Sequence, residues 1–198
     1  MRIFIAGATG VLGIRLVRLL VAAGYVVAGM TRSPGKTVLL RDAGAEPVVC
    51  DVFDAAELTS ATTEFAPDVV YHQLTDLPDK AGEITAYRER NNRIRTEGTR
   101  NLLEAAAIAG ARVIAQSISW ENTSSGDMTA AFERMIIEFG GVVIRYGQLW
   151  GPGTHYEAAP PDPPRIHVDD AARLSVPVLG VSAGMTVVAD DRAIGTLL

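Results

Sequence analysis

The sequence predicts an α/β fold in which a doubly wound parallel sheet carries helices on both faces. Short apolar runs alternate along the chain with longer segments whose apolar residues recur every three or four positions. A glycine-rich segment stands where the first apolar run passes into the first helical segment. Strands that alternate with helices form parallel sheets through right-handed crossovers, which places helices on both faces. The 198 residues suffice for one sizeable core, so we expect a single domain over 1–198.

The first half of the chain carries a local signal for each expected element. The run RIFIAG at 2–7 is apolar and ends on a glycine, as a buried strand before a tight turn does. The next segment places Leu12, Leu16, Leu19 and Leu20 on one helical face and ends at Gly24, a residue suited to a helix C-terminus. Asp54, with a Glu three residues later, gives a capping-box-like start to a later helix. The expected strands here are 2–7, 25–31, 47–51 and 68–74, and the expected helices are 11–24, 37–44 and 54–65.

The second half continues the alternation. The longest expected helix, 83–109, has small and apolar residues at helical spacing, and 128–141 is an amphipathic helix that ends in a glycine pair. The segment 158–164 has four prolines in seven residues, so neither helix nor central strand fits and a stiff loop is expected. The remaining strands are 111–118, 142–149 and 184–190, and a further helix starts within 167–180, where Asp169 and Asp170 are the expected N-cap and first-turn acids.

Composition and charge exclude several classes of protein. The net charge of −5 and the absence of a basic patch argue against nucleic acid as a partner. Cys50 is the only cysteine, so no intramolecular disulfide can form and a reducing compartment fits. The N-terminus lacks the long apolar region of a signal peptide, and no stretch approaches the roughly 20 apolar residues that span a bilayer. We therefore expect a cytoplasmic protein with no membrane or nucleic-acid partner and no metal site.

The segment GATGVLG sits between the first expected strand and the first expected helix. In a dinucleotide-binding turn, the first glycine permits the tight turn, the second lets backbone approach a pyrophosphate, and the third lets helix pack on strand. The helix N-terminus then offers free N–H groups and the positive end of its dipole to the phosphates. The segment therefore predicts a Rossmann-type dinucleotide site. Its expected contacts are Gly7, Thr9, Gly10, Val11, Leu12 and Gly13.

This glycine spacing resembles that of the short-chain dehydrogenase/reductase superfamily, in its extended or atypical, epimerase-like branch. Further segments are similar to that branch over most of the chain: DVVYHQL (68–74), EGTRNLLEAA (97–106), VVIRYGQLWGPGT (142–154) and RIHVDDAA (165–172). The resemblance implies a dinucleotide cofactor and the activity of an oxidoreductase or of a nucleotide-sugar epimerase or dehydratase. It also implies that Asp51 and Val52 contact the adenine. By the same resemblance, Gln73, Leu74 and Ser117 lie on the nicotinamide side.

The end of the second expected strand distinguishes NAD from NADP. An acid there would accept hydrogen bonds from the ribose of NAD, whereas an arginine would pair with the extra phosphate of NADP. This chain has no acid at that place but has Thr31 and Arg32, with Lys36 shortly after. A guanidinium matches a phosphate in bidentate geometry, and an ammonium adds a point charge. We expect NADP, with NAD less favoured and with a solvated Arg32 as the alternative interpretation.

The pair of residues that the family uses for proton transfer is absent. The resemblance implies a Tyr that acts as acid and base and a Lys four residues later that lowers its pKa, both on the helix expected at 128–141. No Tyr-x-x-x-Lys occurs anywhere in the 198 residues. Arg95 also stands roughly where the family often carries an Asn. The sequence therefore leaves open whether the protein is an enzyme.

Several residues could replace the missing pair. Ser117 and Ser119 are two residues apart at the end of the fifth expected strand, so an ideal strand would place both on one face, although the strand could end between them. The family uses a hydroxyl at this place to polarise the substrate. Tyr156, beside His155, follows the Gly-Pro-Gly turn and is the other candidate. Glu133 could act as an acid or base, but we expect it to be solvated, as helix glutamates usually are. His72 is expected to be a satisfied core histidine.

The region expected to bind the substrate, 150–166, is short and rich in proline. Either the protein is truly compact, or segments of a longer chain are absent from this sequence. We expect an NADP-dependent oxidoreductase or a nucleotide-sugar epimerase/dehydratase-like protein that acts on an unknown small molecule. The alternative is a non-catalytic NADP-binding sensor or regulatory protein. The apolar width of the helix at 128–141 also suggests a homodimer, although a wide buried face would explain it equally well.

Overall fold

The computed structural model describes residues 1–76, 84–119, 126–190 and 196–197. Its strands are β1 (Arg2–Ala6), β2 (Val26–Thr31), β3 (Glu46–Val49), β4 (Val69–His72), β5 (Arg112–Ile118), β6 (Val142–Tyr146), β7 (Gln148–Trp150), β8 (Arg165–His167), β9 (Gly184–Val188) and β10 (Thr196–Leu197). Its α-helices are α1 (Val11–Ala22), α2 (Thr37–Asp42), α3 (Ala55–Phe65), α4 (Ile84–Arg93), α5 (Thr99–Ala109), α6 (Gly126–Glu138) and α7 (Val168–Ser175). A π-helical turn, η3 (Ile94–Gly98), joins α4 to α5.

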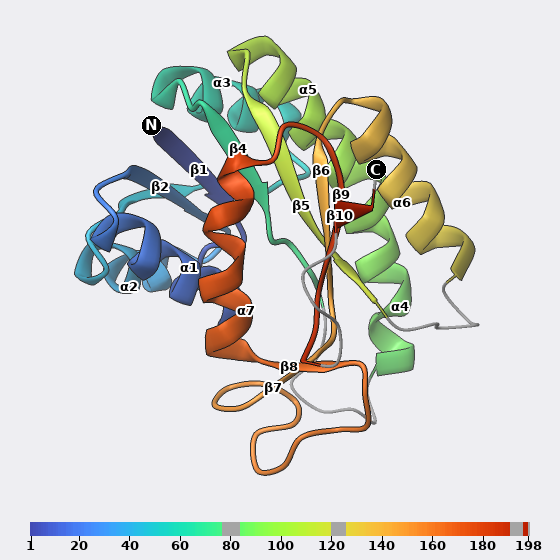
Figure 1. Cartoon of the computed structure of the whole chain (residues 1–198). Helices are drawn as coiled ribbons and strands as arrows, with labels where there is room; N and C mark the ends of the chain where they lie inside the picture. The colour runs from blue at the N-terminus through green and yellow to red at the C-terminus, as the bar shows by residue number, and fades with distance from the viewer. Residues whose placement is uncertain (77–83, 120–125, 191–195, 198) are drawn as a thin grey trace.

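The described strands other than β7 and β8 form one sheet in the order β10-β9-β6-β5-β4-β1-β2-β3 (Figure 1). Neighbours are parallel from β3 across to β9, and β10 is added at the edge antiparallel to β9. The chain runs from β1 outward to β2 and β3, and then returns to build β4, β5 and β6 on the other side. The strand order therefore reverses between β1 and β4, the place where such sheets bind ligands. The predicted doubly wound fold is confirmed.

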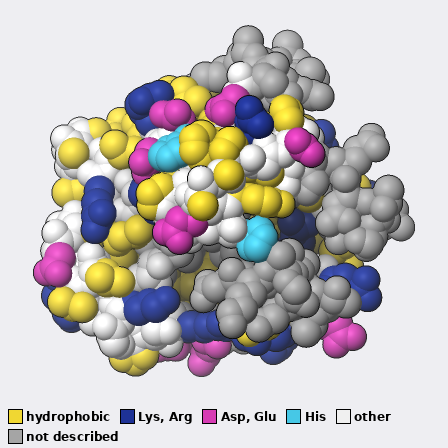
Figure 2. Space-filling model, turned by 90° about the horizontal axis from the view of Figure 1, so that it is seen from below, with side chains coloured by type: hydrophobic (Ala, Val, Ile, Leu, Met, Phe, Trp, Pro, Cys, Tyr) yellow, Lys and Arg dark blue, Asp and Glu magenta, His cyan; other side chains and the backbone are white. Residues whose placement is uncertain are grey.

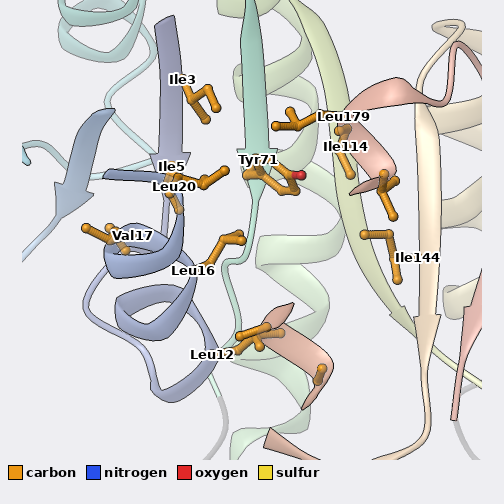
Figure 3. Packing of buried hydrophobic residues seen from close by; sticks show 14 of the residues in the cluster. Ile3, Ile5, Leu12, Leu16, Val17, Leu20, Tyr71, Ile114, Ile144 and Leu179 are labelled. Carbon is orange, nitrogen blue, oxygen red and sulfur yellow. The ribbon is translucent and has the colours of Figure 1, made fainter. Parts of the chain in front are cut away.

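Two apolar layers, one on each face of the sheet, hold the helices in place. Figure 3 shows Leu16 and Leu20 of α1 directed toward β1 and β4, where Ile5 and Tyr71 lie, on the face that α7 also covers. Leu19 is exposed and lies off the buried face that the sequence predicted for it. The Tyr71 hydroxyl donates to the carbonyl oxygen of Ser175 at 2.9 Å, so its polar group is satisfied within this core. The other face is covered by α3, α5 and α6, whose buried side chains include Leu58, Leu102 and Ile136. None of the described helices is long and apolar enough to cross a membrane.

The strand expected at 142–149 is wrong in its second part. β6 ends at Tyr146, and the chain then turns so that the N–H of Gln148 donates to the carbonyl of Pro164 at 2.8 Å. β7 pairs in parallel with β8 as a separate two-stranded sheet. Gly147 permits this turn because it packs directly on the backbone of Arg165, where a Cβ would lie 2.7 Å from the carbonyl carbon.

The helix expected over 83–109 is interrupted by a π turn, and residue 83 lies outside the described residues. The Thr99 hydroxyl donates to the carbonyl of Ile94, five residues back, at 3.0 Å. His72 of β4 contacts the same hydroxyl at 3.0 Å, so the turn is fastened to the sheet by buried hydrogen bonds. Periodicity alone could not reveal this turn, because one extra residue disturbs the helical spacing only locally.

The N-termini of two helices test further expectations. Asp54 is the N-cap of α3 and accepts from the N–H of Glu57 at 3.0 Å, as predicted. The N-cap of α7 is His167, not Asp169, which lies in the first turn and pairs with Arg15 at 2.6 Å. On α6, Phe132 and Ile136 are buried in this chain's second core and Met135 packs against it, as does Phe139 just after the helix, while the homodimer stays a prediction.

Candidate functional site

A cleft of about 1120 Å³ lies outside the carboxyl ends of the central strands, where the strand order reverses. Figure 2 looks at the molecule from this end, where basic, acidic and hydrophobic side chains are interspersed. The structure brings together in this cleft all residues that the sequence predicted for the cofactor, while their binding roles stay predictions. They are Gly7, Thr9, Gly10, Val11, Leu12, Gly13, Thr31, Arg32, Asp51, Val52, Gln73, Leu74 and Ser117.

The glycine turn between β1 and α1 is built so tightly that side chains would not fit. Gly7 has a φ of +86°, and a Cβ there would lie 2.6 Å from the carbonyl oxygen of Gln73. A Cβ on Gly13 would collide with the carbonyl oxygen of Gly7. Gly10 is the N-cap of α1 without any side-chain cap, and the first turn of α1 has no acidic residue. This end of α1 therefore offers uncapped N–H groups and positive potential to an anion in the cleft.

The end of β2 is tied to this turn by hydroxyl groups. The Thr31 hydroxyl lies 3.1 Å from the Thr9 hydroxyl of the glycine turn. It also accepts from the N–H of Ser33 at 3.2 Å, which shapes the backbone just after Arg32. Arg32, Ser33 and Lys36 all line the cleft. Two cationic side chains thus stand at the mouth of the cleft beyond β2.

One acid, Asp76, lies near Arg32 and bears on the choice of cofactor. Its carboxylate is 3.5 Å from Arg32 and 2.9 Å from Arg90 of α4, and its side chain is only 11% exposed. Arg90 therefore makes the closer contact with Asp76. The Arg32 side chain is 56% exposed, so it remains able to turn toward a ligand in the cleft.

The end of β3 presents Asp51 and Val52 in a fixed conformation. The Asp51 carboxylate accepts from the N–H of Phe53 at 3.0 Å, which closes a local turn. The side chain of Asn101 on α5 donates to the carbonyl of Val52 at 3.0 Å. Cys50 is buried just after the end of β3, and burial, more than the neighbouring acids, raises the pKa of its thiol to about 12, which makes the thiol inert.

His72 at the end of β4 is a core residue, as predicted. Its Nδ1 accepts from the N–H of Leu74 at 3.4 Å, which leaves the proton on Nε2 for the hydroxyl of Thr99. Burial, followed by the positive charge of Arg95, lowers its pKa to about 4, so the ring is neutral at pH 7. The adjacent Gln73 lines the cleft, and its buried carboxamide has no hydrogen-bond partner among the described residues.

At the end of β5, Ser117 belongs to a buried network that the sequence did not predict. Its hydroxyl donates to Glu133 of α6 at 2.6 Å. Arg145 of β6 donates to both oxygens of the same carboxylate, at 2.8 and 2.5 Å. Glu133 is 4% exposed, so the expectation that it is solvated is wrong. The side chain is buried because Arg145 neutralises it, and sequence spacing does not reveal that partner.

The other two catalytic candidates have different positions. Ser119 lies just beyond the end of β5, donates its N–H to the carbonyl of Tyr146 at 2.8 Å, and is not among the described residues that line the cleft. β5 ends at Ile118, between the two serines, so strand alternation does not place them on one face. Tyr156 does line the cleft, and its hydroxyl donates to Gln148 at 3.2 Å.

Arg95 is a residue of the cleft that the sequence did not predict to lie there. It lies in the π turn, lines the cleft, and donates from Nη1 to the hydroxyl of Thr129 on α6 at 2.5 Å. Its guanidinium carbon lies 5.7 Å from the centre of the Phe132 ring. Burial lowers its pKa, and the charge of Glu133 opposes that effect. The only signal in the sequence was its departure from the Asn of the family resemblance.

Comparison with known proteins agrees with this geometry. The chain is 36% identical over 187 residues to a 3-diazoavenalumate denitrifying reductase from Streptomyces sp, a match that covers 79% of this chain and 59% of that protein. It is 33% identical over 129 residues to a UDP-glucose 4-epimerase from Mycolicibacterium smegmatis, covering 60% of this chain and 39% of the relative. The chain therefore spans less than two thirds of the length of either curated relative.

Solved structures share the fold. The NAD complex of the UDP-glucose 4-epimerase from Thermus thermophilus matches 99% of this chain and 79% of that chain, with a TM-score of 0.80 and 20% identity. The family model described as the NAD dependent epimerase/dehydratase family matches residues 3–134. That match includes the glycine turn, the ends of β2 to β5 and the buried Glu133. The chain belongs to the NAD-dependent epimerase/dehydratase family.

Proposed function

We propose that the protein binds NADP in this cleft and acts as an NADP-dependent oxidoreductase on a small molecule. The observation that carries the proposal is the pairing of an uncapped glycine turn with Arg32 and Lys36 at the end of β2. The first fits a pyrophosphate, and the second fits the phosphate that distinguishes NADP from NAD. Membership of an NAD-dependent family and the name of the reductase relative support the oxidoreductase class.

The residues of the cleft fit this cofactor as a set. Gly7 and Gly13 let the turn close tightly on its own backbone, and at Gly10 a Cβ would meet only the carbonyl oxygen of Gly7, at 3.3 Å, so the phosphates would approach the backbone at the N-terminus of α1. Asp51 and Val52 would lie beside the adenine. The unpartnered carboxamide of Gln73 and the hydroxyl of Ser117 would serve the nicotinamide half.

The chain's own residues would position the substrate next to the cofactor. NADP, when bound, supplies the exchange of a hydride. Ser117 would orient the reacting group of the substrate, and Glu133, held by Arg145, would fix the direction of the Ser117 proton. Tyr156 would close the cleft from the loop after β7. Relatives named as epimerases make an epimerase or dehydratase acting on a nucleotide sugar the second enzymatic candidate.

One observation favours a non-catalytic alternative, an NADP-binding sensor. The carboxylate that stands behind Ser117 is already paired with Arg145, and no Tyr-x-x-x-Lys exists to move a proton. A protein that only senses the cofactor would keep the glycine turn and Arg32 and could dispense with proton transfer.

The test combines binding with turnover. We would first titrate the protein with NADPH and NADH, and then follow NADPH absorbance with simple ketones and 3-diazoavenalumate. Turnover of UDP-glucose would be followed by chromatographic separation of its 4-epimer, because epimerisation consumes no NADPH. Selective NADPH binding with turnover of any of these supports the enzyme. Selective NADPH binding without turnover of any of them favours the sensor. Absence of NADPH binding would contradict both.

A further inference from the structure

The cleft contains a partly buried cation, Arg95, that the proposed cofactor contacts do not use. Its guanidinium lies over the ring of Phe132, which also lines the cleft. We propose that Arg95 binds the carboxylate of an organic acid, and that this acid is the substrate of the NADP-dependent reaction. That the acid is the substrate rests on the proposed function, whereas the carboxylate site itself rests on the geometry around Arg95.

The position of Arg95 is fixed from two sides. Hydrogen bonds from Thr99 to Ile94 and to His72 hold the π turn that contains Arg95. All three of these residues are buried. On the other side, the Nη1 of Arg95 donates to Thr129 of α6. A cation whose backbone and one donor are both anchored is preorganised for a ligand and loses little side-chain freedom on binding. π turns are also frequent at functional sites.

The charge of Arg95 lacks a carboxylate partner among the described residues. The nearest acid that affects it is Glu133, yet both oxygens of Glu133 are held by Arg145, and one also accepts from Ser117. The acids that line the cleft have other partners: Asp51 closes its own turn, Asp76 pairs with Arg90 and Arg32, and Glu157 accepts from the N–H of Gly153. A partly buried guanidinium without a counter-ion is costly, and a bound anion would remove that cost.

The shape of this end favours a carboxylate over a diphosphate. The bond to Thr129 uses only Nη1, so the edge formed by Nε and Nη2 makes no hydrogen bond to a described residue. That edge fits the two oxygens of one carboxylate. Phe132 and Ile94, both almost fully buried, form apolar wall beside it. One fork next to an apolar wall fits an acid with an apolar body, whereas a diphosphate would call for several cations.

The experiment uses benzoate as the anionic probe and benzamide as its neutral match, titrated by calorimetry with and without saturating NADP. The variants are Arg95→Gln, Arg95→Lys and the control Arg134→Gln, an exposed arginine of α6 that does not line the cleft. We expect wild type and Arg134→Gln to bind benzoate and not benzamide. Arg95→Gln should weaken benzoate at least about tenfold, and Arg95→Lys should bind it with intermediate affinity because it keeps the charge and loses the fork.

Three results would overturn the assignment: no benzoate binding to wild type, equal binding by Arg95→Gln, or Arg95-dependent binding of pyrophosphate that is tighter than that of benzoate. Circular dichroism on each variant separates misfolding from loss of the site, and Arg95→Lys keeps the test valid if Arg95→Gln does not fold. NADP affinity is measured on the same samples. Arg95-dependent benzoate binding without NADP binding would contradict the proposed function and leave only an anion site. NADP binding without Arg95-dependent benzoate binding would contradict only the carboxylate site.

Discussion

The hydroxyl of Ser117 donates a 2.6 Å hydrogen bond to Glu133, a carboxylate buried between β5, β6 and α6. A serine hydroxyl has a single proton, so the Ser117 oxygen can offer only lone pairs to the cleft while this bond is intact. The role that the family resemblance implies, donation to a substrate carbonyl, requires a proton on Glu133 or a rotation of the hydroxyl. The geometry therefore favours a ligand group that donates to Ser117, such as a hydroxyl or an amide N–H.

The ion pair between Glu133 and Arg145 should matter for stability. Arg145→Met leaves a carboxylate that is 6% exposed without its cation. Because Arg145 itself is 36% exposed, we expect a loss of about 2–3 kcal/mol, below the range for a fully buried pair. Urea unfolding measures it, with Arg134→Met on the exposed side of α6 as the control. Adding Glu133→Gln to Arg145→Met should recover part of the loss. Equal losses in the free energy of unfolding for Arg145→Met and Arg134→Met would show that the ion pair does not stabilise the fold.

The glycine turn should tolerate no side chain. Gly13→Ala drives a methyl group into the carbonyl of Gly7, so we expect a destabilisation of about 1–3 kcal/mol and loss of NADPH binding. Gly180→Ala is the matched control, because a Cβ there meets nothing within 4 Å. Thermal unfolding and NADPH fluorescence titration read the two effects separately. Normal NADPH affinity in a folded Gly13→Ala protein would argue against phosphate binding at this turn.

His72 should make stability depend on pH. Its pKa is about 4 in the folded protein and about 6.5 when unfolded, so the unfolded chain binds an extra proton between these values. Stability is therefore complete above about pH 6.5 and falls as the pH drops toward 4, by up to about 3 kcal/mol. Unfolding measured across this range should show the slope in wild type and in His155→Gln. The slope should be reduced in His72→Gln, and an unchanged slope there would refute the assignment.

The parts of the fold that the sequence predicted follow from local rules. The cofactor residues share one cleft because parallel strands bring their carboxyl ends to one edge, so Gly7, Arg32, Asp51 and Gln73 are adjacent despite their separation in sequence. The N-cap of α3 was predictable because Asp54 and Glu57 are neighbours on one helical turn.

The features that were missed depend on partners far apart in the chain. Glu133 is buried because Arg145, on a different element, neutralises it, and no helical periodicity reports that contact. The split of the strand after Tyr146 depends on the approach of Arg165 to Gly147. The cleft position of Arg95 depends on a π turn that His72 stabilises through Thr99. Each requires tertiary geometry that spacing cannot supply.

The central claim, that the cleft binds NADP through Arg32, is tested most directly by the affinities of NADPH and NADH for wild type, Arg32→Ala and the control Arg41→Ala. Arg41 is exposed on α2 and contacts Thr37 of its own helix. We predict that wild type and Arg41→Ala prefer NADPH, and that Arg32→Ala weakens NADPH about 10–100-fold with little change for NADH. Equal affinities of wild type for both cofactors, or an equal loss of both in Arg32→Ala, would contradict the claim.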